Sequence, residues 1–371
     1  MEKILTKKLE RQKRFTEDIL AGMIDLVRVV DKNNRIIFLN DPMKNLIGDV
    51  RGQACYTSLG KPCRCKNCIT ETTIKHGKII KKEEIVKDKI FSVVSSPIRD
   101  ENGKIYCAVE VFRDVTEKKK MEKIILDQNL KMKKDLDFAK YIQQRIIPQD
   151  GTYNDMIRID SKYIPSEMLG GDVFDIINID EENIGIYMAD VSGHGVTASM
   201  MTMFIRQTLK SLKKDALNPG YTLNYLNSRY KELGLDDNYY ITILYGVFNK
   251  KDSTIKIVNG GHNCMPIIFN DDEAHEIFLP GLPICNLFDD VEYTQHTIHL
   301  NKGDRVLFYT DGISEARNNF KEVYSDRILE ICFENLHASG GTLVNKIVDD
   351  VVDFSNNKFD DDIAIMMMEV I

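Results

Sequence analysis

The chain has 371 residues, of which 43% are apolar and 29% charged, and it carries a net charge of −7. These proportions exclude wholesale disorder and predict two or three globular domains, while the acidic balance argues against a general nucleic-acid binder. The charged start, and the absence of any apolar run near ~18 residues, predict a cytoplasmic protein without a signal peptide or a membrane span.

The first part of the chain predicts a helix followed by a small mixed domain. Residues 1–22 predict an amino-terminal helix, and residues 23–116 predict a domain that opens with a strand–turn–strand pattern. Its turn, Asp31-Lys-Asn-Asn34, is favourable because asparagine tolerates positive φ. A short helix ends at Gly48, and further strands are expected at 79–86, 90–97 and 106–112.

Four of the eight cysteines lie within one loop of this domain. They form the pattern Cys-x7-Cys-x-Cys-x2-Cys, with the residues Cys55, Cys63, Cys65 and Cys68. Closely spaced thiolates suit Zn²⁺ or an iron–sulfur cluster, although this spacing matches no common zinc finger. A bound metal or cluster would make the domain a sensor of redox state, oxygen or metal. Free thiols and a redox disulfide are the alternatives.

Three features within residues 15–117 resemble a PAS domain. They are the early hairpin, the helix over Asn40 to Gly48 and the closing tetrapeptide Asp114-Val-Thr-Glu117. The tetrapeptide is similar to the junction at which PAS domains continue into an output helix. The resemblance implies a domain that receives a signal.

Residues 117–147 contain no glycine or proline and end just before Pro148, which predicts one long helix. Along one side of this helix, apolar residues recur every seven positions, at Ile125, Met132, Ala139 and Ile146. The neighbouring seam is interrupted by Gln128 and Asp135. We favour a coiled-coil-like linker that joins two copies in a parallel homodimer and transmits a signal. The alternative is a helix packed on its own domain.

Residues 148–371 predict a second α+β domain. Strands and helices mix here with few β–α–β alternations, so we expect stacked sheets flanked by helices and not a doubly wound sheet. The expected helices are 196–214, 222–233 and 342–355. The expected strands are 157–163, 173–179, 184–188, 241–248, 254–258, 266–269, 305–309 and 363–370.

Four aspartates stand where apolar runs of this domain begin or end, namely Asp172, Asp190, Asp311 and Asp361. A carboxylate at the end of a buried strand lies at the rim of a sheet, where it can meet other carboxylates. Converging carboxylates repel one another unless hard cations lie between them, so the pattern predicts a two-metal site. The main-chain carbonyl of Val191 is a further oxygen ligand in this hypothesis.

Three residues near these aspartates are weaker candidates, namely Asp175, His194 and Asp362. For His194 we favour a hydrogen bond within its turn over a role in contacting phosphate. For His262, in Asn259-Gly-Gly-His262, a role in stabilising the turn is likewise favoured.

The order and the amino-acid sequences of these segments closely resemble the motifs of the SpoIIE/RsbU-type branch of the metal-dependent (PPM) protein phosphatases. The matching segments are Ala139-Lys-Tyr-Ile-Gln143, Gly170-Gly-Asp-Val-Phe-Asp175, Ala189-Asp-Val-Ser-Gly-His-Gly195, Asn259-Gly-Gly-His262, Tyr309-Thr-Asp-Gly312 and Asp361-Asp-Ile363. The resemblance implies an α/β/β/α sandwich over about residues 139–371, with two Mn²⁺ or Mg²⁺ ions in a cleft at one edge.

Carried over to this chain, the resemblance assigns roles to the ligands. Asp190 would bridge both ions and Val191 would add its carbonyl, Asp311 and Asp361 would bind one ion, and Asp172 would hold the other. A water bridging the ions would attack a phosphoserine or phosphothreonine in line. The implied substrate is a STAS-type anti-anti-sigma protein, which on dephosphorylation captures an anti-sigma factor and frees a sigma factor. The alternative is a catalytically silent scaffold that binds the phosphoprotein.

Overall fold

The structure, a computed structural model, describes residues 2–236, 238–288 and 291–371, without the side chains of residues 2, 3, 5 and 326. The chain divides into two compact units, Met1–Lys131 and Met132–Ile371, which we call the first and the second unit. Over the described residues, none of the helices combines the length and the apolar character that crossing a bilayer requires.

The first unit is built on one antiparallel sheet of five strands in the order β2-β1-β5-β4-β3. Asn40 begins the second helix, since its side chain accepts a hydrogen bond from the Met43 amide, and Gly48 ends it with a φ of 85°. The elements are α1 (Glu2–Gly22), β1 (Leu26–Asp31), β2 (Ile36–Leu39), α2 (Asp41–Ile47), η1 (Thr57–Leu59), α3 (Ile69–His76), β3 (Ile80–Val86), β4 (Lys89–Arg99) and β5 (Ile105–Asp114).

The helix α3 was not predicted from the sequence. It directly follows the cysteine-rich loop, with Cys68 as its N-cap residue and Gly77 in the left-handed conformation after its last turn. Its sequence is rich in threonine, which has a low intrinsic helix propensity. Burial of Ile69, Thr70 and Thr73 therefore stabilises this helix more than its local preference does.

The long helix α4 spans Thr116–Ile146 and follows β5 directly. Its start is fixed by Asp114, whose carboxylate accepts hydrogen bonds from the amide and the hydroxyl of Thr116. Several of its large apolar side chains are exposed, among them Ile125, Met132 and Phe138, with exposed fractions of 57%, 62% and 64%. The helix thus has apolar surface that the described chain leaves open to solvent.

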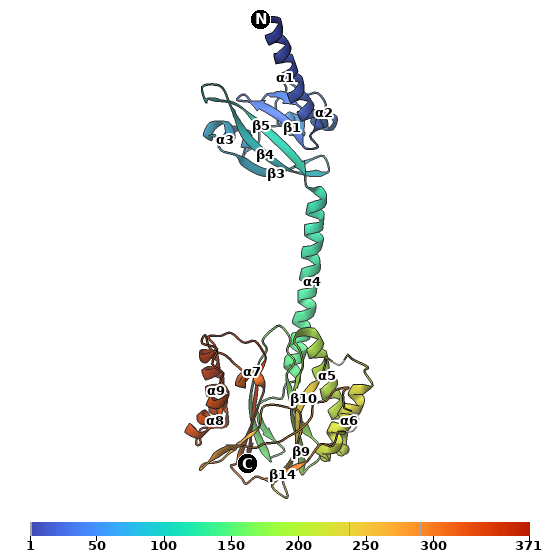
Figure 1. The fold of residues 1–371 in the computed structure, drawn as a ribbon, viewed down its shortest axis with the longest axis vertical. Coiled ribbons are helices and arrows are strands. Elements are labelled where there is room, and N and C mark those ends of the chain that lie inside the picture. The colour runs from blue at the N-terminus through green and yellow to red at the C-terminus, as the bar shows by residue number, and fades with distance from the viewer. Residues whose placement is uncertain (1, 237, 289–290) are drawn as a thin grey trace. The chain divides into compact units, whose positions relative to one another are not determined.

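The second unit consists of two stacked sheets with helices on both outer faces (Figure 1). The first sheet has the strand order β14-β11-β10-β9-β8 and the second β13-β12-β15-β16-β7-β6. The strands are β6 (Gly151–Tyr153), β7 (Ile157–Ile164), β8 (Val173–Asn178), β9 (Asn183–Val191), β10 (Ile241–Asn249), β11 (Thr254–Gly260), β12 (Ile267–Phe269), β13 (Ala274–Glu276), β14 (His296–His299), β15 (Arg305–Tyr309) and β16 (Ile363–Val370). The helices are α5 (Gly195–Ser211), η2 (Lys213–Leu217), α6 (Pro219–Lys231), α7 (Asp311–Ser314), α8 (Ser325–Glu334) and α9 (Gly340–Phe354).

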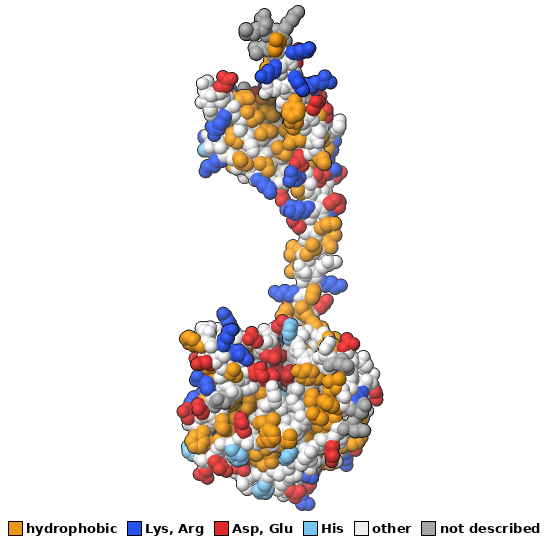
Figure 2. All heavy atoms as spheres, viewed as in Figure 1, with side chains coloured by type: hydrophobic (Ala, Val, Ile, Leu, Met, Phe, Trp, Pro, Cys, Tyr) orange, Lys and Arg blue, Asp and Glu red, His pale blue; other side chains and the backbone are white. Residues whose placement is uncertain are grey.

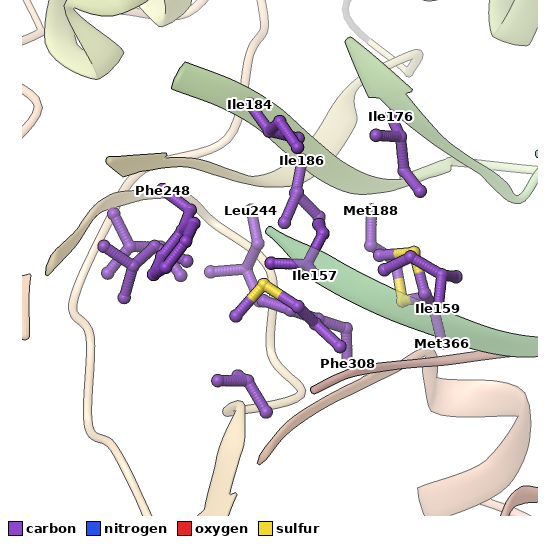
Figure 3. Close-up of a cluster of buried hydrophobic side chains, with 14 of the residues drawn as sticks. Ile157, Ile159, Ile176, Ile184, Ile186, Met188, Leu244, Phe248, Phe308 and Met366 are labelled. Carbon is purple, nitrogen blue, oxygen red and sulfur yellow. The ribbon is translucent and has the colours of Figure 1, made fainter. Parts of the chain in front are cut away.

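The main core of the second unit lies between the two sheets. Ile186 and Met188 of β9 face Ile157 of β7, Phe308 of β15 and Met366 of β16 across this layer (Figure 3). Two further cores pack α5 and α6 against the first sheet, and α8 and α9 against the second. The long central strands β9, β10 and β16 therefore bury both of their faces, which explains their continuous apolar runs. The predicted α/β/β/α sandwich is confirmed.

Three short strands and two α-helices of the second unit, α7 and α8, were not predicted. The strands β6, β13 and β14 have only three or four residues each, too few for a period-2 pattern to emerge. The helix α8 was missed because it is only ten residues long and follows a polar loop.

Candidate active site

The four predicted aspartates come from both sheets at the same edge of the sandwich. Asp172 stands just before β8, and Asp190 lies near the end of the neighbouring antiparallel strand β9. Asp311 follows β15, and Asp361 stands just before its antiparallel neighbour β16. Figure 2 shows acidic side chains gathered on one face of this unit, with lysine and arginine side chains beside them.

The electrostatics of these aspartates show that they lie close to one another. Burial, together with the charges of Asp311 and Asp361, raises the pKa of Asp190 to about 7. Burial and the neighbouring Asp190 and Asp362 hold the pKa of Asp172 well above its ordinary value. Partial burial also raises the pKa of Asp361, with Asp311 adding to the shift. The structure therefore brings all four predicted carboxylates into one repelling group.

Asp362, the neighbour of Asp361, points its carboxylate at backbone amides. It accepts hydrogen bonds from the amides of Ser166 at 2.7 Å and Gly171 at 2.6 Å. Its side chain is 2% exposed. Asp362 therefore fixes the loop that carries Asp172, and this is a positioning role.

Two glycines permit the close approach of backbone segments around these carboxylates. A Cβ atom on Gly171 would lie 2.9 Å from the carbonyl oxygen of Val191, and one on Gly312 would lie 1.8 Å from the carbonyl oxygen of Asp362. Neither position tolerates a larger side chain without movement of the backbone. The glycines thus bring the Val191 carbonyl against the loop before Asp172.

Three further residues support the aspartates and were not assigned these roles from the sequence. The Thr310 hydroxyl donates to Oδ2 of Asp172 at 2.7 Å, and the Asn263 side chain donates to Oδ2 of Asp311 at 3.4 Å. Gln143, near the end of α4, donates to the carbonyl of Gly170 and accepts from its amide, at 2.8 and 3.1 Å. Thr310 and Gln143 lie in segments quoted for the family resemblance, but nothing in their spacing identifies the atoms they contact.

Asp175 lies outside the group of four carboxylates. Its carboxylate forms ion pairs with Arg206 at 2.8 Å and Lys210 at 2.7 Å, both on α5. The carboxylate is 5% exposed, so this contact joins β8 to α5 inside the domain. The arrangement accounts for Asp175 as a buried, paired charge.

The two histidines differ in their surroundings. His194 is the N-cap residue of α5, and its exposed ring lies 3.2 Å from the carboxylate of Glu167. His262 is 2% exposed, and its Nε2 lies 2.9 Å from the carbonyl oxygen of Tyr309. Burial lowers the pKa of His262, which favours the neutral ring. His262 thus has the structural environment that was favoured for it.

The chemistry of the donor set fits hard divalent cations, which prefer carboxylate and carbonyl oxygens. Four carboxylates gathered at one sheet edge repel one another, and a cation bound between them would relieve this repulsion. In the part of the chain that the structure describes, no three His, Cys, Asp or Glu side chains are gathered closely enough to hold a metal ion as they stand. The donors are therefore near one another without forming a closed ligand set.

The cysteine-rich loop brings three of its four thiols to one small interior cavity of the first unit. Cys55, Cys65 and Cys68 line a space of about 20 Å³, whereas Cys63 is exposed. The Lys61 ammonium lies 3.7 Å from the sulfur of Cys65, and burial raises the pKa of Cys55 to about 11. All four cysteines are free thiols.

The two stacked sheets, the flanking helices and the aspartates at one edge define a protein phosphatase domain of the PPM class, and the five-stranded first unit has the architecture of a PAS domain. The family model "Stage II sporulation protein E (SpoIIE)" matches residues 180–371, and a PAS domain model matches residues 22–117. The chain belongs to the SpoIIE family. The predicted family and its class, the protein serine/threonine phosphatases, are thereby confirmed.

Curated relatives and solved structures agree with this assignment. The chain is 24% identical over 240 residues to the phosphoserine phosphatase RsbU of Bacillus subtilis (strain 168), covering 64% of this chain and 70% of RsbU. It is 30% identical over 190 residues to the phosphoserine phosphatase RsbP of the same organism, covering 50% of this chain but only 46% of RsbP. The chain thus spans less than half the length of RsbP. The SiaA-PP2C domain of Pseudomonas aeruginosa shares the fold, with a TM-score of 0.57 at 16% identity over 66% of this chain and 98% of that domain.

Proposed function

We propose that this protein is a signal-regulated, metal-dependent phosphatase that removes phosphate from phosphoserine or phosphothreonine on a STAS-type anti-anti-sigma protein. The observation that carries the proposal is the convergence of four aspartates at one sheet edge, where burial and the charges of Asp311 and Asp361 raise the pKa of Asp190 to about 7. The substrate class is proposed because RsbU and RsbP, by name, are phosphoserine phosphatases.

The catalytic edge, which we define as the sheet edge carrying Asp172, Asp190, Asp311 and Asp361, would bind metal ions through oxygen atoms that neighbouring residues hold in place. The carboxylates of Asp172, Asp190, Asp311 and Asp361 and the carbonyl of Val191 would hold two Mn²⁺ or Mg²⁺ ions. When bound, such ions lower the pKa of a water and neutralise charge on phosphoryl oxygens. The Thr310 hydroxyl orients Asp172, and the amide contacts of Asp362 keep the loop beneath it in position.

Regulation would act through the end of α4. Gln143 makes both of its hydrogen bonds to the backbone of Gly170, two residues before Asp172. A shift or rotation of the helix would move this loop and change metal occupancy at Asp172. We therefore propose that α4 passes the state of the PAS domain to the catalytic edge.

The signal itself would be received in the PAS domain, where Cys55, Cys65 and Cys68 line one cavity. Zn²⁺ or an iron–sulfur cluster remains our first proposal for the cysteine-rich loop, and free thiols or a redox disulfide are the alternatives. Metal analysis and the absorption spectrum of protein purified without oxygen test this proposal. A protein free of metal under those conditions would contradict it.

The test of the proposed function is phosphate release from a phosphoserine-bearing STAS protein in the presence of Mn²⁺. We expect release that stops when the metal is chelated and resumes when it is restored. Binding of the phosphoprotein without release at any metal concentration would instead support the alternative, a silent scaffold. The two outcomes differ in one readout, free phosphate, while binding is followed in parallel.

A further inference from the structure

Beside two of the aspartates lies a cavity of about 140 Å³ with a basic side. Asp311 and Asp361 line it together with Arg317 and Lys358. Arg317 belongs to the segment after α7, which returns on itself through a bridge to Val323, and Lys358 lies in the turn before β16. Folding therefore brings two cations, distant in the sequence, next to the same pair of carboxylates.

The two cations are free to take part in binding. Both side chains are exposed, and among the described residues neither of them has an ion-pair partner within 4.0 Å. Glu315 and Asp360 also line the cavity, so its walls hold both signs of charge. A phosphoryl dianion bound between cations held by the aspartates on one side and Arg317 and Lys358 on the other would meet positive charge from both.

A second, wider cavity of about 770 Å³ adjoins the first, and Arg317 and Glu315 line both. Apolar side chains contribute to its walls, including Met265, Val323 and Leu329. Two carboxylates, Glu276 and Glu330, give it an acidic character. The wider cavity also reaches Asn263, whose side chain donates to Asp311. It is thus continuous with the catalytic edge.

We propose that Arg317, with Lys358, binds the phosphoryl oxygens of the substrate, and that the wider cavity binds the chain flanking the phosphorylated residue. This inference rests on the proposed function and adds a substrate class: phosphoserine segments with apolar and basic flanks. The planar guanidinium of Arg317 matches two phosphoryl oxygens, whereas an ammonium offers a point charge. The carboxylates of Glu276 and Glu330 select against acidic flanks.

The first experiment measures steady-state kinetics of the full chain with Mn²⁺ and a phosphoserine peptide. For Arg317→Ala we expect KM to rise about tenfold or more with a smaller change in kcat, and for Lys358→Ala a smaller rise. Arg317→Lys restores part of the loss, because charge returns without the bidentate geometry. Lys251→Ala, an exposed lysine in the turn after β10, is the matched control and leaves both constants unchanged. An unchanged KM in Arg317→Ala would overturn the proposal.

The second experiment tests whether the acidic side chains of the wider cavity select peptides by the charge of their flanks. The wild-type protein is compared on peptides with basic and with acidic flanks, and we expect the basic peptide to have the higher kcat/KM. Glu330→Lys should reduce or reverse that preference, since it places a cation where the basic flank would lie. Equal kcat/KM for both peptides in the wild type would overturn the assignment of the wider cavity.

Peptide binding, measured by titration calorimetry, separates this inference from the proposed function. If the wild type binds the peptide, loses binding on Arg317→Ala and yet releases no phosphate, the binding site stands and the phosphatase proposal fails. If phosphate is released but neither binding nor KM depends on Arg317, the phosphatase stands and this inference fails. Absence of both release and Arg317-dependent binding contradicts both.

Discussion

Two adjacent aspartates at the catalytic edge, Asp361 and Asp362, have different roles although they differ by only one position in the sequence. Asp361 is exposed and carries its charge toward Asp311, whereas Asp362 is buried and directs both carboxylate oxygens to amides of the loop over 166–172. The sequence reads Asp-Asp, and spacing alone does not distinguish them. The resemblance assigned the ligand role to Asp361, and the geometry of Asp362 accounts for the second aspartate as a support.

Replacing each of the pair by alanine should separate stability from metal binding. Asp362→Ala leaves the buried amide of Gly171 and the amide of Ser166 without their acceptor, so we expect a loss of about 1–3 kcal/mol in the free energy of unfolding. Asp361→Ala, at an exposed position, should cost less than about 0.5 kcal/mol and yet weaken Mn²⁺ binding severely. Urea unfolding and Mn²⁺ calorimetry of both variants measure this. Equal stability losses would contradict the division of roles.

At the scale of the residue, the sequence predicted the four aspartates but not their supports. An aspartate at the end of an apolar run is visible in the sequence, because the run itself marks a buried strand. The hydroxyl of Thr310 on Asp172 joins positions 138 residues apart, and no local pattern encodes that contact. The same holds for Arg317 and Lys358, which approach the site only once α7 and the turn before β16 have formed.

Among the elements, long strands and capped helices were predicted well, and short elements were not. β16 begins with six consecutive apolar residues, and α2 has its asparagine cap and terminal glycine, so both carry their signals locally. The helix α3 has low intrinsic propensity and forms through tertiary burial, and the edge strand β13 has three residues. Whether α3 and β13 form is therefore decided by their contacts with other elements and not by their own sequences.

The junction between β5 and α4 should depend on pH. Hydrogen bonds from Lys89 and Thr116 lower the pKa of Asp114 to about 2, from an ordinary value near 3.8. A depressed folded-state pKa stabilises the fold above about pH 4, and this contribution is lost as the pH falls toward 2. Because the pair is exposed, we expect a difference below about 1 kcal/mol between the wild type and Asp114→Asn at pH 6. In urea unfolding this difference should shrink below pH 4, and a constant difference down to pH 3 would contradict the assignment.

The exposed apolar side of α4 should set the association state of the protein. If the helix joins two copies, as the sequence predicts, then Ile125→Glu with Met132→Glu places like charges on the seam and should convert a dimer into a monomer. The control pair is Lys123→Glu with Lys131→Glu, also exposed on α4 but charged in the native chain. Light scattering after size-exclusion chromatography reads the mass. A wild-type monomer, or a dimer that survives the seam substitutions, would contradict the prediction.

In the whole molecule, one continuous helix, α4, connects the PAS domain to the phosphatase domain, and we propose that it passes the signal between them. Gln143 is the residue at which that helix meets the loop before Asp172. Removing residues 1–116 should therefore change turnover or Mn²⁺ affinity. Unchanged values after the deletion would contradict regulation by the first unit.

A single side chain in the full chain provides a finer test of the same coupling. Gln143→Ala removes both hydrogen bonds to Gly170, so we expect Mn²⁺ affinity to fall severalfold, measured by calorimetry. Gln144→Ala, the exposed neighbour of the same residue type, is the control and should bind Mn²⁺ as the wild type does. Equal Mn²⁺ affinities in the two variants would show that Gln143 does not couple α4 to the metal site.

Two matched substitutions decide whether the aspartates at the sheet edge carry the hydrolysis. Asp190→Asn and Asp175→Asn make the same change at two largely inaccessible carboxylates, one in the repelling group and one paired with α5. Phosphate release from a phosphoserine STAS protein with Mn²⁺ should fall by about a thousandfold or more in Asp190→Asn, because a proposed ligand of both ions is lost. In folded Asp175→Asn it should stay within about tenfold of the wild type. Comparable losses in the two variants, or retained activity in Asp190→Asn, would show that hydrolysis does not depend on these aspartates as proposed.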